Sequence, residues 1–515
     1  MQKHLNLPLT TETNLTQDRV AVLSECYSLP HLQESIRSIQ RASDFYVPRA
    51  LRRYLFDAIQ NGFFEIVSPL TGRASAAKNS VVLGEDKTTF VFFEGFIVGI
   101  GHLARGFPLC ALILPAQRLF LKMVDDHWAV RHDHVEQLAE QLRVHSLEAQ
   151  FETGIDLLSG DPNFAHHIWN QLPCLQAIIE HCDLGDGVQI INTHEPLGSI
   201  KLIFPELARL MMRHVPDVFL GNVNAVPKLR LPIGSTFIPK RLVNRLLIAF
   251  NSREQSAQEL SLRLRVAGHR STILWLSIRT RTRVPTNQVE VLAKVGCDYL
   301  SSNPDGLIIL DGHSIPDDFT DNITYDKPAQ RRLVDECSSL AAEVASAIIA
   351  RTSRLDSVVP AIGISISQTI LLAQHATVYL CHHGTVQHKV GWFSATPGIV
   401  HCNRRTLQVA GLGRYIADQS EIADTPIYLS HDLVESPTEF DSEDAASGED
   451  RAENYYINDV GEVSDTVMRL FDPKSDAHFP MPPVAQPSIA RSAAILIVLV
   501  ALVIGYLQSI LVIFA

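Results

Sequence analysis

Residues 271–292, STILWLSIRTRTRVPTNQVEVL, carry the clearest structural signal in this sequence. The first eight residues read as an apolar strand, three arginines follow, and a helical pattern begins at Asn287. Residues 306–312, GLIILDG, repeat the strand and end it with Asp311 and Gly312. Short apolar strands that alternate with helices are typical of parallel α/β layers. We therefore predict an α/β fold with a parallel sheet in the second half of the chain.

The same alternation extends along the chain. Asp326 and Pro328 are start signals for a further helix. More strands are predicted at 358–364, 377–381 and 398–401. In the first half an apolar strand begins at residue 89, and helices at 134–150 and 164–181 precede a short strand at 188–191. Residues 1–80 read as mostly helical and irregular.

Composition bounds the class of protein. The chain has 515 residues, 46% of them hydrophobic and 19% charged, which excludes a disordered chain and a polytopic membrane protein. The formal net charge is −12, but residues 432–476 hold fourteen acidic and three basic residues, a local balance of −11. The remaining chain is close to neutral. We therefore expect no nucleic-acid partner, and the charge is compatible with a nucleotide site in the body.

The two ends of the chain differ. Residues 1–18 lack the apolar run of a secretory signal. Residues 492–515, SAAILIVLVALVIGYLQSILVIFA, form 24 residues without a charge, or about 36 Å of helix against a hydrocarbon core of about 30 Å. We expect a single transmembrane tail anchor, with Arg491 and the body on the cytoplasmic side. The alternative is a buried core helix. Eight scattered cysteines fit a reducing compartment.

A first candidate site is residues 163–173, NFAHHIWNQLP. His166 and His167 are candidate general bases, because imidazole titrates near neutral pH. Neighbours on a helix point about 100° apart, so at most one of the two should face a site. The alternative is a pair of hydrogen-bonded core or cleft histidines.

A second candidate site is residues 381–398, CHHGTVQHKVGWFSATPG. A predicted strand ends at Cys381, Gly384 permits a tight turn, and a helix can start beyond it. Ligands of open α/β sheets bind at the carboxyl ends of the strands, and the amides at a helix N-terminus suit phosphate. The polar donors around this turn are His383, Thr385, Gln387, His388 and Lys389.

A third candidate site is the arginine run after residue 278. Arg279, Arg281 and Arg283 are spaced at two, so in extended chain they would project from one side and suit a diphosphate. Asp311 would lie at the same sheet edge. The alternative is a solvated basic loop. The Asp and His residues at 125–127 and 132–134 match no metal-ligand spacing, so a polar surface helix is favoured there over a metal site.

In their order along the chain, these segments resemble glycosyltransferases of the GT-B type, which have two Rossmann-like domains. The likeness covers residues 85–420 and is closest to the family-61-like group of surface-polysaccharide and glycan-modifying enzymes. The matching residues are Phe164, His166, Leu172, Pro173, Arg279, Asn287, His383, Gly384, Pro397 and Gly398. Thr385 replaces the usual small residue, and His401 stands where an acidic residue is often found, which leaves the donor sugar open.

The resemblance implies an enzyme that moves a sugar from a nucleotide-sugar to a glycan, lipid-linked or protein acceptor without a metal cofactor, and the predicted tail anchor would attach this enzyme to a membrane. The resemblance implies an acceptor domain at 81–240 and a donor domain at 241–430. Composition adds an acidic and Pro-rich linker at 431–487 and the membrane segment at 488–515. The donor phosphates would bind the Gly384 turn and the three arginines, and His166 or His167 would take the acceptor proton. The expected donor-binding residues are Arg279, Arg281, Arg283, Asp311, His383, Gly384, Thr385 and Lys389.

Two alternatives to a transferase stay open. One is a non-catalytic, tail-anchored scaffold that recruits membrane-assembly partners through its acidic linker. The other is a hydrolase or phosphatase that uses the histidines, although the sequence contains no GxSxG motif and no phosphate-loop motif.

Overall fold

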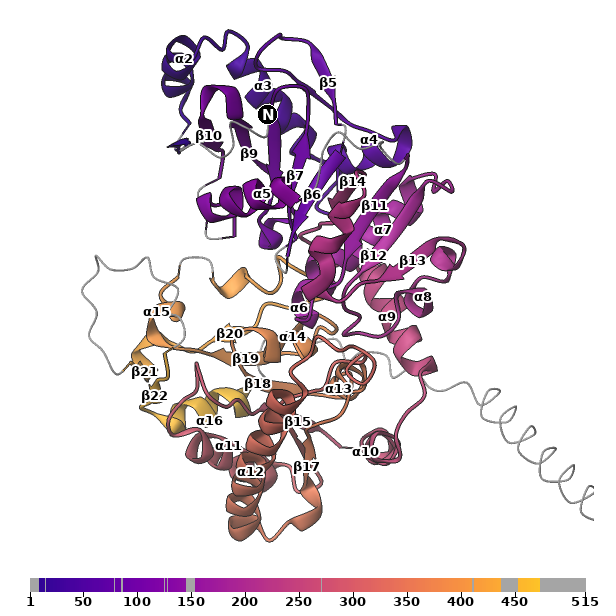
Figure 1. The fold of residues 1–515 in the computed structure, drawn as a ribbon. Helices are drawn as coiled ribbons and strands as arrows, with labels where there is room; N and C mark the ends of the chain where they lie inside the picture. The colour runs from indigo at the N-terminus through magenta and orange to yellow at the C-terminus, as the bar shows by residue number, and fades with distance from the viewer. Residues whose placement is uncertain are drawn as a thin grey trace, which may run out of the picture. The chain divides into compact units, whose positions relative to one another are not determined.

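The computed structural model describes residues 9–472, apart from residues 14, 78, 85–86, 125, 127, 145–152, 270, 410–411 and 437–452 (Figure 1). The chain divides into Met1–Asp472 and Pro473–Ala515. The predicted tail anchor at 488–515 and Arg491 lie outside the described residues. Among the helices that are described, none is long and apolar enough to cross a membrane.

The N-terminal part combines helices with a mainly antiparallel sheet. Its helices are α2 (Gln17–Cys26), α3 (Leu32–Ser43), α4 (Arg53–Asn61) and α5 (His132–Val144). Short strands pair as β2 (Phe45–Val47) with β3 (Leu51–Arg52), and β4 (Glu65–Val67) with β5 (Ala74–Ala76). The larger sheet has the order β1-β10-β9-β8-β7-β6, formed by β1 (Thr10–Glu12), β6 (Asn79–Leu83), β7 (Thr88–Phe92), β8 (Ile97–Ile100), β9 (Leu109–Leu114) and β10 (Leu119–Lys122). In this sheet the edge strand β1 pairs parallel with β10.

The apolar run that begins at residue 89 is an antiparallel hairpin. Gly95, at φ +85°, lies between β7 and β8, and this left-handed conformation lets the chain reverse. Residues 1–80, predicted to be mostly helical and irregular, also supply strands β1 to β5. The first Rossmann-like domain was expected to begin at residue 81, which lies in β6 of the mainly antiparallel sheet.

The first parallel sheet follows this layer. Its strands are β11 (Ile155–Ser159), β12 (Val188–Asn192), β13 (Met211–His214) and β14 (Leu229–Pro232), in the order β13-β12-β11-β14. The connecting segments include α6 (Phe164–His166), η3 (His167–Gln171), α7 (Leu172–His181), α8 (Ile200–Ile203) and α9 (Lys240–Ser252). All three strand pairs are parallel.

The second parallel sheet lies in the predicted donor half. Its strands are β15 (Ile273–Ser277), β16 (Leu307–Asp311), β17 (Val358–Ala361), β18 (Val378–His382), β19 (Gly398–His401) and β20 (Ile427–Tyr428). Its helices are α10 (Ala257–Gly268), α11 (Gln288–Ser302), α12 (Lys327–Thr352), α13 (Ile366–Ala373), α14 (Thr385–Gly391) and α15 (Arg404–Leu407). The order β17-β16-β15-β18-β19-β20 is 3-2-1-4-5-6 in chain order, as in dinucleotide-binding Rossmann folds. The predicted α/β class with parallel sheets is confirmed, and so is the cap at Asp326, whose side chain accepts from Ala329 N–H (2.9 Å).

Residues 453–472, inside the segment expected to be linker, pack on the second sheet. This returning segment contains β22 (Tyr456–Ile457), paired with β21 (Val434–Glu435), and α16 (Val460–Arg469). The side chain of Asn287 donates to Ile457 O (2.9 Å) and accepts from Ile457 N–H (3.1 Å). Val463 and Val467 are fully buried in the core of this half.

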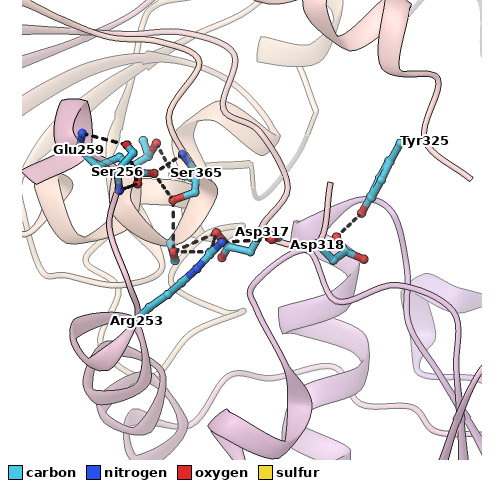
Figure 2. Close-up of polar contacts among 9 residues, drawn as sticks. Arg253, Ser256, Glu259, Asp317, Asp318, Tyr325 and Ser365 are labelled. Carbon is cyan, nitrogen blue, oxygen red and sulfur yellow. Dashed lines mark hydrogen bonds and ion pairs between the residues drawn. The ribbon is translucent and has the colours of Figure 1, made fainter. Parts of the chain in front are cut away.

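The loop between β16 and α12 connects the two parallel sheets. Its Asp317 carboxylate pairs with Arg253, which follows α9 (Figure 2). Its Asp318 carboxylate accepts from the Glu195 N–H (2.8 Å), just beyond β12, and from the Tyr325 hydroxyl (2.9 Å). The loop is therefore fixed against the carboxyl edge of the first sheet.

Candidate functional site

A cavity of about 440 Å³ lies at the carboxyl edge of the first parallel sheet. Its volume falls in the range of small-molecule sites, roughly 300–1,000 Å³. It is lined by Lys87, Leu103, Phe107, Trp128, Arg131, Asp161, Pro162, Asn163, His166, His194, Thr324, Tyr325 and Asp326. The walls thus come from the antiparallel layer, from the loops after β11 and β12, and from the loop that precedes α12. Aromatic faces beside cationic and carboxylate groups suit a polar organic ligand.

Of the two adjacent histidines, His166 is the one that lines the cavity. Asn163 caps α6 by accepting from Ala165 N–H (3.0 Å), which starts the turn that presents this imidazole. His166 Nδ1 lies 3.0 Å from Asn170 Oδ1. Its ring lies 6.2 Å from the Trp128 ring, centroid to centroid.

His167 points into the protein instead and is 0% exposed. Its Nδ1 lies 3.0 Å from Gln171 Oε1, and the same amide oxygen accepts from the Gly160 N–H (2.8 Å) at the end of β11. Burial lowers the pKa of His167 to about 4. The structure therefore separates the pair as the helical geometry predicts, with one imidazole at the cavity and one in the core.

At the edge of the second sheet, His383 follows β18 and precedes Gly384, whose φ is +104°. His383 Nδ1 lies 3.0 Å from the Tyr428 hydroxyl. Burial, with smaller contributions from the positive charges of Arg283 and Arg279, lowers the pKa of His383 to about 4. Gly384 is the N-cap of α14, whose first residue is Thr385, and both are half-buried. This is the point between β15 and β18 where the strand order reverses.

The three arginines do not share a side, so that geometric expectation was wrong. Arg281 and Arg283 have positive φ values of 77° and 59°, so the loop is bent rather than extended. Arg281 turns outward to an exposed ion pair with Glu336 (3.1 Å). Arg279 is half-buried, with Nε donating to Thr282 O (2.8 Å), and burial lowers its pKa. Arg283 Nε is buried without a hydrogen-bond partner among the described residues.

Lys389 and Asp311, both expected to bind the donor, are held by each other. Lys389 Nζ donates to Asp311 Oδ1 (2.6 Å), Gly312 O (2.9 Å) and Ser314 Oγ (3.2 Å). Burial raises the pKa of Asp311 to about 6, against the opposing effect of the Lys389 charge. The pair ties α14 to the end of β16, and neither residue lines the cavity.

Two contacts bring the edges of the parallel sheets together. The Trp169 and Trp392 rings lie 6.3 Å apart, and His388 stacks on Trp392 at 3.7 Å. The pKa of the buried His388 is lowered well below its usual value by burial, with further contributions from His383 and His166. In the second contact, Thr324 Oγ1 lies 2.6 Å from His194 Nε2.

Sequence reasoning missed several of these residues. His194 lies three residues beyond the predicted strand at 188–191 and could have been identified by its position near the carboxyl end of that strand. Trp128, Arg131 and Thr324 enter the cavity from distant segments and had no local signal.

The Asp and His residues that the structure describes within 125–127 and 132–134, near the start of α5, do not converge on one point but contact different residues. Asp126 lies 3.0 Å from His102, Asp133 lies 2.9 Å from Arg131, and His134 Nδ1 accepts from the Arg131 N–H (3.3 Å). Asp125 and His127 lie outside the described residues. Within the described part of the chain, no group of three or more His, Cys, Asp or Glu residues could hold a metal ion.

No family model and no curated protein matches this chain. Solved structures match with low scores. A trehalose-6-phosphate synthase, OtsA, is 8% identical over 67% of this chain and 72% of its own, with a TM-score of 0.26. MnaA from S. aureus with UDP is 15% identical over 52% and 60%, with a TM-score of 0.21. A UDP-GlcNAc 2-epimerase from Methanocaldococcus jannaschii is 11% identical over 60% and 75%, with a TM-score of 0.22. Scores this low establish neither family nor activity.

Proposed function

We propose that this protein is a glycosyltransferase that moves a sugar from a nucleotide-sugar to an acceptor hydroxyl. One observation carries the proposal: the carboxyl edges of two parallel sheets meet, one with an imidazole in a cavity and the other with partly buried arginines. A nucleotide-sugar bound at the edge of the second sheet and an acceptor bound in the cavity of the first would have the sugar and the acceptor hydroxyl close together, where the two edges meet.

The donor is proposed to bind the second sheet at the β15–β18 reversal. Arg279 and Arg283 lie close enough to His383 to lower its pKa, so their charges converge on this point. Arg283 Nε is buried and unpartnered among the described residues, which costs free energy unless a ligand accepts its hydrogen bond. Guanidinium groups bind phosphate oxygens in a fork-like geometry, so a diphosphate fits. The same charges would stabilise the departing diphosphate, and we propose that no metal cofactor is needed.

The acceptor is proposed to bind the cavity, with His166 as the general base. His167 is assigned a structural role because it is fully buried and bonded to the end of β11. The acceptor is a glycan, a lipid-linked sugar or a protein. Membrane attachment through the C-terminal tail, with the body on the cytoplasmic side, and the family-61-like relationship are part of the same proposal.

Nucleotide binding tests this assignment. The purified protein is titrated with UDP, GDP and CMP by calorimetry. Arg283→Ala is expected to weaken binding of the preferred nucleotide by about 10- to 100-fold, the worth of a charged hydrogen bond. Arg281→Ala is the matched control, because it removes the same group from the same loop but only from an exposed ion pair with Glu336. Absence of binding for all three nucleotides would favour the scaffold, and equal losses in both variants would refute the proposed phosphate site.

A further inference from the structure

We infer that Asn170 is a positioning residue: it holds His166 in the tautomer with its hydrogen on Nδ1 and leaves Nε2 free to take a proton from a ligand in the cavity. The use of Nε2 as a general base rests on the proposed function, whereas the tautomer does not. Asn170 lies in η3, His167–Gln171, a turn of π-helix between β11 and α7. Such turns frequently occur at functional sites.

Ser235 fixes the orientation of the Asn170 amide. Asn170 Nδ2 donates to the Ser235 carbonyl oxygen (2.9 Å), and a carbonyl oxygen only accepts. Ser235 is itself held, because its N–H donates to Asn170 O (2.8 Å) and its hydroxyl donates to Trp169 O (2.7 Å). Asn170 Oδ1 is therefore the amide atom that faces His166 Nδ1, at 3.0 Å.

This orientation determines the tautomer of His166. An amide oxygen only accepts, so Nδ1 must carry the hydrogen of the bond to Asn170. Neutral imidazole has one N–H, and the lone pair is then on Nε2. Within the described part of the chain no hydrogen bond reaches Nε2, and His166 lines the cavity. The charged and titratable groups nearby are Lys87, Arg131, Asp161, His194, Tyr325 and Asp326 in the cavity and His388 across the interface.

In the proposed reaction, the acceptor O–H proton passes to Nε2 while the acceptor oxygen bonds to the anomeric carbon. The bond from that carbon to the diphosphate oxygen breaks, and its electron pair leaves with the diphosphate. The imidazolium has N–H groups on both nitrogens, so the bond from Nδ1–H to Asn170 Oδ1 becomes charge-assisted and stronger. Asn170 therefore acts through His166 and does not itself touch substrate.

The neighbouring pair, His167 and Gln171, is a matched control for His166 and Asn170. His167 Nδ1 faces Gln171 Oε1 at the same 3.0 Å distance, four residues apart as in the first pair. An amide-to-carboxylate substitution at Asn170 or at Gln171 places the new charge beside one imidazole and not the other.

The experiment follows carbethoxylation of each histidine by diethyl pyrocarbonate in the intact protein, read by peptide mass spectrometry. Only unprotonated imidazole reacts, so a rate series from about pH 5 to about pH 9 gives the protonation midpoint of His166. Asn170→Asp is expected to raise this midpoint by about one pH unit, because a carboxylate stabilises the imidazolium. Gln171→Glu is expected to leave it in place. Asn170→Leu is expected to lower kcat about tenfold or more with little change in KM.

The outcomes separate this inference from the proposed function. A His166 midpoint that stays in place in Asn170→Asp, or that moves in Gln171→Glu, overturns the inference. If the midpoint moves as expected but no nucleotide binds, the proposed function fails and the tautomer assignment stands. Thermal melts check folding, and Asn170→Asp keeps the test decisive if Asn170→Leu does not fold.

Discussion

Lys389→Met is expected to destabilise the fold rather than weaken nucleotide binding. Lys389 is 3% exposed and Asp311 is 0% exposed, and the ammonium is bonded to three oxygen atoms at the end of β16. Methionine keeps the length of the side chain but removes its charge. The substitution therefore leaves a buried carboxylate without its counter-ion.

The magnitude and its pH dependence follow from the carboxylate. Removing one partner of a buried ion pair costs about 3–5 kcal/mol of folding free energy. The pKa of Asp311 is already raised to about 6 by burial with Lys389 present, and loss of the ammonium raises it further. A carboxyl group whose folded-state pKa exceeds its unfolded value of about 3.9 binds a proton more tightly when folded. The variant therefore loses stability as the pH rises from the unfolded pKa to the raised folded-state pKa of Asp311. We expect the full loss at about pH 8 and a smaller loss at about pH 5.

Urea denaturation followed by tryptophan fluorescence at both pH values measures the effect. The double variant Lys389→Met/Asp311→Asn is expected to recover part of the loss at the higher pH, because the buried group is then neutral. A Lys389→Met protein that unfolds at the wild-type urea concentration but binds UDP, GDP or CMP more weakly would refute the buried-pair reasoning. That result would instead support the prediction from the sequence that Lys389 binds the donor.

Two further predictions concern the site and the returning segment. His166→Asn is expected to lower kcat for sugar transfer by about 10²–10⁴-fold, the range for a lost general base, while nucleotide affinity measured by calorimetry stays unchanged; a full-rate His166→Asn enzyme would exclude this base. A chain that ends after residue 436 lacks β22, which Asn287 binds, and α16, which packs into the core of the second half. Thermal melts followed by circular dichroism are expected to show a less stable protein, and calorimetry is expected to show that it no longer binds nucleotide. A chain that ends after residue 472 is expected to keep binding, and equal behaviour of the two chains would contradict the role given to the returning segment.

The second half of the chain was predictable because its strands are short, apolar and buried on both faces. Residues Ile273–Ser277 and Leu307–Asp311 are buried throughout, and Pro328 with the Asp326 cap marks the start of α12. The first half was harder for the same physical reason. Strands β7 and β8 are also buried on both faces, so they show no alternation that would distinguish an antiparallel hairpin from a parallel strand.

The arginine loop shows why site geometry did not follow from spacing. A spacing of two places side chains together only where the backbone is extended, and distant residues decide the backbone here. Glu336 on α12 pairs with Arg281, and the returning segment bonds the far end of the loop, where Tyr455 N–H donates to Val284 O (3.1 Å). Asn287, which the family resemblance singled out, binds the backbone of Ile457, 170 residues away. Its contact therefore stabilises the loop, and the bend leaves Arg279 and Arg283, without Arg281, close enough to His383 for their charges to lower its pKa.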